Sequence, residues 1–127
     1  MHRYLHIKTR NTWWDAKYEC EKLGAYLVTI GTEEENSWLR ETFLPVWDPA
    51  TCNPWWDCCS HWTGANDIEE EGRFVWTEND NRVTSYFNWH PDEPDNSGEQ
   101  DCVLMCRDGI WGTTQCHQMY SYICEKD

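Results

Sequence analysis

Eight cysteines in a chain of 127 residues restrict the folds open to this sequence more than any other feature. This density is high for a cytosolic protein and is typical of chains that fold in an oxidising compartment. An even number of cysteines fits four disulfides, although sequence alone leaves many connectivities open. The length suits one domain with its own hydrophobic core, and we expect residues 1–127 to form that domain.

The charge of the chain excludes two classes of partner. A net charge of −13 argues against binding to nucleic acid or to an anionic membrane surface. The sequence contains no apolar run long enough to cross a bilayer, so we expect no membrane insertion. Met1 precedes polar and basic residues rather than an apolar run. We therefore expect a mature secreted, extracellular chain with an added initiator methionine.

Capping patterns predict two early helices. In each, a threonine at the N-cap position is followed three residues later by an acidic residue that completes a capping box. Glycine and proline provide the stop signals. We expect the second helix to direct Trp38, Leu39 and Phe43 toward the core. The capping pairs are Thr12 with Asp15 and Thr32 with Glu35, and the stops are Gly24 and Pro45.

Short apolar or alternating segments between turn residues predict strands, most of them in the second half of the chain. Two early helices packed on a later, mostly antiparallel sheet define an α+β domain. The predicted strands cover residues 3–8, 26–30, 62–64, 73–77, 83–87, 102–105 and 120–124.

Carboxylates and amides gather in the stretch around Pro94. Hard cations such as Ca²⁺ take six to eight oxygen ligands from loops, so the pattern indicates a calcium or sugar loop. A solvated acidic turn is the alternative, since Pro94, Asn96 and Gly98 also favour turns. The oxygen donors are Asp92, Glu93, Asp95, Asn96, Glu99, Gln100 and Asp101.

Residues 45–61 form a second unusual segment, rich in proline and carrying three cysteines beside Trp55 and Trp56. Long irregular segments in compact domains tend to be functional or fixed by covalent links. Most of the ten tryptophans belong in the core, but their flat faces also suit stacking against sugar rings.

These features, in this order, resemble the C-type lectin-like domain in its short form, over nearly the whole chain. Trp62-Thr63-Gly64-Ala65 stands where the family has its Trp-Ile-Gly-Leu strand, and Glu71-Gly72 with Phe74 and Trp76 matches its Glu-Gly turn. Trp89 and Glu93-Pro94-Asp95 match its long-loop motif. The resemblance implies an outer disulfide between Cys20 and Cys124 and an inner one between Cys102 and Cys116.

The family's principal calcium site holds the ion to which sugar hydroxyls coordinate. Only some of its ligand positions carry suitable residues in this sequence. Gln100 replaces the usual glutamate, with Glu99 one place earlier, and the Trp-Asn-Asp triplet reads Trp111-Gly112-Thr113. Because calcium affinity follows the charge and number of the ligands, we predict that this site is weak or absent. Sugar hydroxyls would then meet the acceptor-rich loop directly. The expected carbohydrate-binding residues are Glu93, Asp95, Glu99, Gln100 and Thr113, with His90, Trp55 and Trp56 as candidate stacking partners.

The resemblance also implies an auxiliary calcium site, and all four of its ligand positions carry oxygen donors here: Asp67, Glu71, Asn96 and Asp101. All four side chains supply oxygen donors, so we expect that Ca²⁺ at this site would clamp the two loops that carry them. The alternative is that these are retained surface charges.

Four cysteines lie outside the family's standard bridges. If the strand beginning at Trp62 runs antiparallel to residues 102–105, either Cys58 or Cys59 approaches Cys106, and the other closes a small ring with Cys52. The two alternatives are a zinc site that uses Cys58, Cys59, Cys106 and His61, and an interchain disulfide in a homodimer.

The expected function is recognition of glycans on microbial or other cell surfaces, as in innate immunity. Glu93-Pro94-Asp95 offers two acceptors and no donor, so the family's sugar-specificity rules do not apply to it. Catalysis is not expected, because Glu93 and Asp95 share one tight loop and do not flank a bond as glycosidase carboxylates do. A module that binds a protein partner or a mineral surface is the alternative.

Overall fold

The computed structural model describes residues 2–52, 58–77, 86–91 and 100–127. Its sheet has the strand order β1-β7-β3-β5-β6, with β2 beside β7 and β4 beside β3. β3 and β7 run parallel and the other pairs run antiparallel, so the sheet is mixed. The strands are β1 (Arg3–Asn11), β2 (Tyr26–Leu27), β3 (His61–Asn66), β4 (Val75–Trp76), β5 (Cys102–Met105), β6 (Trp111–Thr114) and β7 (Tyr120–Lys126).

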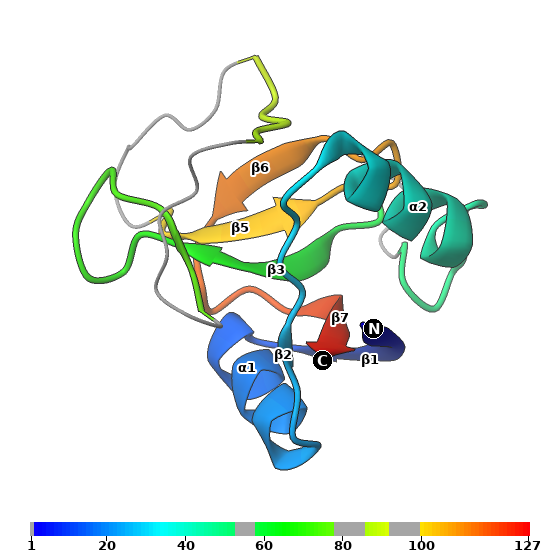
Figure 1. The fold of residues 1–127 in the computed structure, drawn as a ribbon, viewed down its shortest axis with the longest axis horizontal. Coiled ribbons are helices and arrows are strands. Elements are labelled where there is room, and N and C mark those ends of the chain that lie inside the picture. The colour runs from blue at the N-terminus through cyan, green and yellow to red at the C-terminus, as the bar shows by residue number, and fades with distance from the viewer. Residues whose placement is uncertain (1, 53–57, 78–85, 92–99) are drawn as a thin grey trace.

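Two helices flank this sheet, as the capping patterns predict: α1 (Trp13–Lys22) and α2 (Glu33–Phe43) (Figure 1). The Thr12 hydroxyl accepts a hydrogen bond from the backbone N–H of Asp15 at 3.2 Å. Thr32 accepts from Glu35 at 3.1 Å in the same way. Gly24 follows α1 with a φ of +72°, a left-handed conformation that glycine adopts without steric cost.

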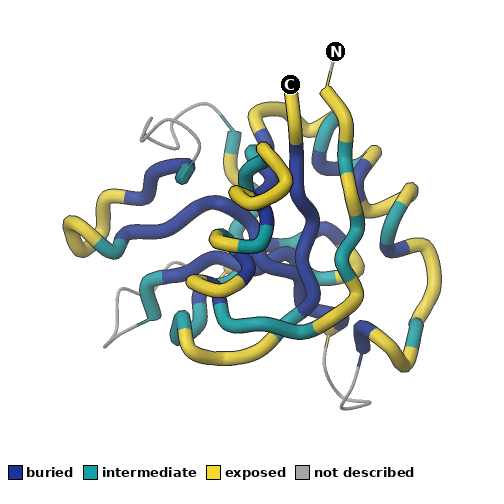
Figure 2. Tube along the Cα trace, turned by 90° about the horizontal axis from the view of Figure 1, so that it is seen from below, coloured by how far each residue is buried: buried dark blue, intermediate teal, exposed yellow. Residues whose placement is uncertain are grey.

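Buried side chains from both helices and the strands form the core. Figure 2 shows buried segments at the centre of the fold, and the pairing of Arg3 with Lys126 brings the two ends of the chain close together. Trp13, Trp62 and Trp111 are among the largest fully buried side chains, which accounts for part of the tryptophan content. The prediction for Trp38 is wrong, because its side chain is 47% exposed, whereas Leu39 and Asn36 of α2 are buried.

Several strand boundaries differ from the sequence-based predictions. β2 and β4 have two residues each, shorter than the predicted segments 26–30 and 73–77. Residues 86 and 87 are not in a strand, and 83–85 lie outside the described residues. β6 was not predicted from the sequence, and it pairs with β5 through Val103 opposite Thr113. That segment has four residues, of which one is apolar and one is a glycine, so its strand signal is weak.

One glycine allows the sheet to pack closely. A Cβ atom at Gly64 would lie 2.8 Å from the backbone carbonyl oxygen of Leu27. The Gly64 N–H also donates to the carbonyl of Val28 at 2.9 Å. The chain at Leu27 and Val28 therefore lies directly against the middle of β3.

Candidate functional site

Three carboxylates meet at one end of the β3–β5 pair. Asp67 directly follows β3 and Asp101 directly precedes β5, and the pairing of Asn66 with Cys102 places them side by side. The N–H of Asp67 donates to the carbonyl of Asp101 at 2.9 Å. Oxygens of Asp67, Glu71 and Asp101 all lie within 4.8 Å of one another. We call this region, together with Gln100, the carboxylate end.

Asp67 is the most buried member of the carboxylate end, with 2% of its surface exposed. Its Oδ2 accepts from the N–H of Gly72 at 2.8 Å. Its Oδ1 is buried and has no hydrogen-bond partner within the described part of the chain. Burial, together with hydrogen bonding to Glu71 and the nearby Asp101, raises the pKa of Asp67 to about 7. Crowded carboxylates with an unsatisfied buried oxygen fit a divalent cation, which favours the charged form of all three.

The principal-site positions are only partly described. Glu93, Asp95 and Glu99, as well as Asn96 of the auxiliary set, lie outside the described residues. Gln100 is half-buried, and its Oε1 has no hydrogen-bond partner among the residues that the structure describes. Thr113 is only 8% exposed.

Of the three candidate stacking residues, His90 alone lies within the described residues. His90 is exposed, and its backbone N–H donates to the carbonyl of Trp111 at 2.8 Å. This bond anchors the segment after Trp89 to β6. Trp55 and Trp56 lie outside the described residues.

All eight cysteines form disulfides within the chain. Both bridges implied by the resemblance are present, and the extra bridges follow the predicted strand pairing, which brings Cys58 rather than Cys59 to Cys106. The zinc site and the interchain disulfide are therefore wrong, because each needs free cysteines. The bridges are Cys20–Cys124, Cys102–Cys116, Cys58–Cys106 and Cys52–Cys59.

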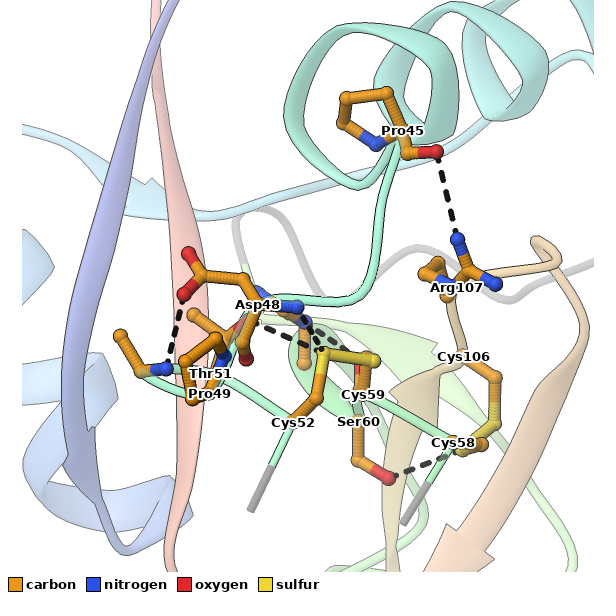
Figure 3. The surroundings of a disulfide bond; sticks show 12 residues. Pro45, Asp48, Pro49, Thr51, Cys52, Cys58, Cys59, Ser60, Cys106 and Arg107 are labelled. Carbon is orange, nitrogen blue, oxygen red and sulfur yellow. Dashed lines mark hydrogen bonds between the residues drawn. A yellow bond between two sulfur atoms is a disulfide. The ribbon is translucent and has the colours of Figure 1, made fainter. Parts of the chain in front are cut away.

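The two extra bridges lie at the opposite end of the β3–β5 pair, which we call the disulfide end: residues 44–52, 58–60 and 106–109 (Figure 3). Lys8 of β1 forms an ion pair with Asp48 at 3.0 Å, and Arg10 donates to the carbonyl of Pro49 at 3.5 Å. These contacts dock residues 45–52 on β1; together with residues 58–60 we call them the inserted segment.

A histidine pair that the sequence analysis missed lies beneath this segment. Nε2 of His6 is 2.8 Å from Nε2 of His61, and Nδ1 of His61 is 2.8 Å from the carbonyl oxygen of Cys59. A carbonyl only accepts, so Nδ1 of neutral His61 carries the proton and its Nε2 accepts from His6. Burial lowers the pKa of His61 to about 4. The two histidines are 55 residues apart, so no local pattern could have revealed them.

The mixed sheet, the two helices and the loop-borne oxygen donors define an α+β binding module. Residues 9–126 match the family described as "Lectin C-type domain", and the chain belongs to this family. Its members are non-enzymatic binding modules, which confirms that catalysis is not the function.

Relatives and solved structures agree with this assignment. A perlucin-like protein of Mytilus galloprovincialis is 38% identical over 99 residues, covering 78% of this chain and 58% of its own. The mouse scavenger receptor C-type lectin carbohydrate-recognition domain aligns with a TM-score of 0.83 and 28% identity, covering 99% of this chain and 88% of that one. The cow CD23 domain, solved in the presence of a GlcNAc2Man3 oligosaccharide, gives a TM-score of 0.80 and 28% identity, with coverages of 98% and 87%.

The chain spans between 33% and 58% of the length of the curated relatives that it matches. Among the described helices, none combines the length and the apolar character that crossing a bilayer requires.

Proposed function

We propose that this chain is a secreted, extracellular lectin domain, residues 1–127, whose long-loop region (residues 89–101) binds carbohydrate. One Ca²⁺ at Asp67, Glu71, Asn96 and Asp101 supports the loop, and sugar hydroxyls are taken directly by its side chains. The observation that carries the proposal is the carboxylate end itself, in which buried Asp67 keeps one oxygen without a partner beside two further acids.

Electrostatics supports a cation in this place. Taking a carboxylate out of water without compensation is costly, and like charges at short range add to that cost. A divalent cation offsets both effects and suits ligands that are all oxygen. Because Asp67 follows β3 and Asp101 precedes β5, the cation would tie the end of the long-loop region to the sheet.

The role of this cation is structural in our proposal, rather than a bridge to sugar. At the principal site, Gly112 has no side-chain oxygen and Thr113 is nearly covered, so the calcium shell there is incomplete. The side chains that remain to bind sugar are hydrogen-bond acceptors: Glu93, Asp95, Glu99 and Gln100, together with Thr113. Acceptors of this kind suit hydroxyl and acetamido N–H groups.

The relatives support carbohydrate as the ligand. The cow CD23 domain was solved with an oligosaccharide, and the mouse neighbour is a carbohydrate-recognition domain by description. Four disulfides suit an extracellular setting, where glycans of microbial or other cell surfaces are displayed. Innate recognition follows as the proposed role, and a homodimer without an interchain disulfide stays a prediction.

A glycan array read once with millimolar calcium and once with EDTA tests the proposal. We expect glycan signal in calcium and a weaker signal that persists in EDTA. The variant Glu93→Ala with Asp95→Ala should lose the signal while folding normally, with Glu69→Ala and Glu70→Ala as the matched control.

Calorimetric titration with calcium tests the metal assignment separately. We expect one Ca²⁺ per chain, no change on adding sugar, and at least tenfold weaker binding in Asp67→Asn. A second calcium that binds only with sugar would contradict the degenerate principal site. An array silent in both conditions, with adsorption to calcite, would instead favour the mineral-binding alternative, which the net charge of −13 also suits.

A further inference from the structure

We propose that the disulfide end holds a second saccharide site, independent of calcium and of the long-loop region, that takes a carboxylated sugar unit such as a uronate. A cavity of about 570 Å³ lies between the C-terminal turn of α2, the inserted segment and the turn after β5. Ligand pockets commonly enclose about 300–1,000 Å³, so one or two sugar rings fit this space.

The cavity is built on the two disulfides that lie outside the family's standard pair. Cys58 and Cys59 line it, and their bridges to Cys106 and Cys52 connect the inserted segment to the end of β5 and to itself. The N–H of Arg107 donates to the carbonyl of Cys58 at 2.8 Å. Covalent and hydrogen-bonded walls are preorganised, which lowers the entropy lost when a ligand binds.

Two arginine side chains from different elements line the cavity. Arg40 belongs to α2, and Arg107 follows β5 and directs Nη1 to the carbonyl of Pro45 at 3.4 Å (Figure 3). Within the described part of the chain neither forms an ion pair, although Lys8, Lys17 and Lys22 all do. Arg3, Arg10 and Lys126 also lack ion pairs among the described residues, and what distinguishes Arg40 and Arg107 is that both line this one cavity. Guanidinium groups bind carboxylates through paired, charge-assisted hydrogen bonds.

The other lining groups indicate a sugar rather than a simple anion. Glu41 and Asp108 also line the cavity, and neither forms an ion pair within the described residues. Their oxygens are acceptors that suit hydroxyl groups. Trp47 contributes an aromatic side chain that is 46% exposed. A uronate offers a carboxylate to the arginines, hydroxyls to the acids and a ring face to the tryptophan.

This site is remote from the long-loop region. The cavity adjoins the residues before β3 and after β5, whereas the carboxylate end adjoins the residues after β3 and before β5. A strand of six residues, such as β3, spans about 20 Å. Charges this far apart are largely screened at physiological ionic strength, so the acidic cluster does not prevent anion binding here.

The test is calorimetric titration in EDTA with the full chain carrying Glu93→Ala and Asp95→Ala, which separates this site from the proposed function. The probes are methyl β-D-glucuronide, methyl β-D-glucoside and sodium sulfate. We expect the glucuronide to bind at least tenfold more tightly than either of the others. Arg40→Ala with Arg107→Ala should weaken it at least tenfold, whereas Arg3→Ala with Arg73→Ala, which removes the same charge elsewhere, should not.

A second variant pair tests the aromatic contact. Trp47→Ala should abolish glucuronide binding, and Trp47→Phe should retain part of it, with thermal unfolding checked for each variant. Equal affinity for glucuronide and glucoside would overturn the proposal. So would equal affinity for sulfate and glucuronide, which would mark an anion site only, or binding that survives loss of both cavity arginines.

Discussion

The two ends of the β3–β5 pair hold their loops in different ways. At the carboxylate end, acids of like charge crowd around buried Asp67, so the loops there repel one another unless a proton or a cation intervenes. At the disulfide end, two covalent bridges and a neutral histidine pair hold the chain without any ligand. Calcium and protons therefore set the repulsion between the loops at the carboxylate end, whereas the covalent links at the disulfide end are fixed once the disulfides form.

Protons should act on the two ends in opposite directions. His61 has a lowered pKa in the folded state, so protonation destabilises the disulfide end. Asp67 has a raised pKa, so in the absence of calcium its protonation reduces the repulsion between carboxylates and stabilises the carboxylate end.

The largest expected effect comes from opening the bridge between Cys58 and Cys106. Changing both residues to serine releases a loop of 48 residues, which should cost about 4 kcal/mol of unfolding free energy. Urea denaturation measures this loss, and the smaller ring between Cys52 and Cys59 provides the control, with about 2 kcal/mol. If calcium affinity at the carboxylate end fell as well, the two ends would not be independent.

The second effect is a loss of stability in acid through His61. Its ordinary pKa is 6.5 and its folded pKa is about 4, so its contribution is complete above pH 6.5 and declines as the pH falls toward 4. The decline should amount to about 3 kcal/mol. Urea midpoints at pH 7 and pH 4 measure it against His61→Gln, in which this share of the pH dependence should vanish. Parallel curves for the two proteins would refute the buried neutral histidine.

The third effect is a gain in stability from a substitution at the carboxylate end. In EDTA at pH 8, Asp67→Asn should stabilise the protein by about 1 to 2 kcal/mol, because it removes a buried like charge. At pH 4 the gain should disappear, since wild-type Asp67 is then protonated. Calcium at 100 times the wild-type dissociation constant should stabilise the wild type by about 2.7 kcal/mol, and a variant with tenfold weaker binding by no more than about 1.4 kcal/mol. An equal calcium response in both proteins would remove Asp67 from the site.

The smallest effect concerns the ion pair between Lys8 and Asp48, in which the lysine side chain is 58% exposed. Exposed pairs contribute little, so Lys8→Ala should cost no more than about 0.5 kcal/mol. Differential scanning calorimetry at two salt concentrations would measure this cost. A larger loss would mean that this pair, and not the disulfides, positions the inserted segment.

The elements that the sequence predicted best are those with local chemical signals. Thr12 and Thr32 mark the helix starts because an N-cap hydroxyl acts within three residues. One antiparallel strand pair predicted that Cys58 or Cys59 would lie near Cys106, and the structure shows that Cys58 forms the bridge. β6 was missed because it is only four residues long and Gly112 interrupts it, so the strand depends on pairing with β5.

In the candidate sites too, the sequence reveals residues that belong to a known pattern but not contacts or burial that depend on the fold. The acids of the carboxylate end could be listed from the family pattern, whereas the pKa of Asp67 depends on burial that only the fold creates. The contact between His6 and His61, and the cavity that Arg40 and Arg107 share, join segments far apart in sequence. No periodicity or spacing rule encodes such contacts.

The pairing of β1 with β7 has a practical consequence for protein engineering. Arg3 lies opposite Lys126, and paired strands are about 5 Å apart, so the backbone enters and leaves the fold at nearly the same point. A host protein with a surface loop could therefore accept the whole module as an insertion, with short linkers on both sides. Joining the same two ends by a short peptide would give a circular chain that exoproteases cannot digest from a terminus.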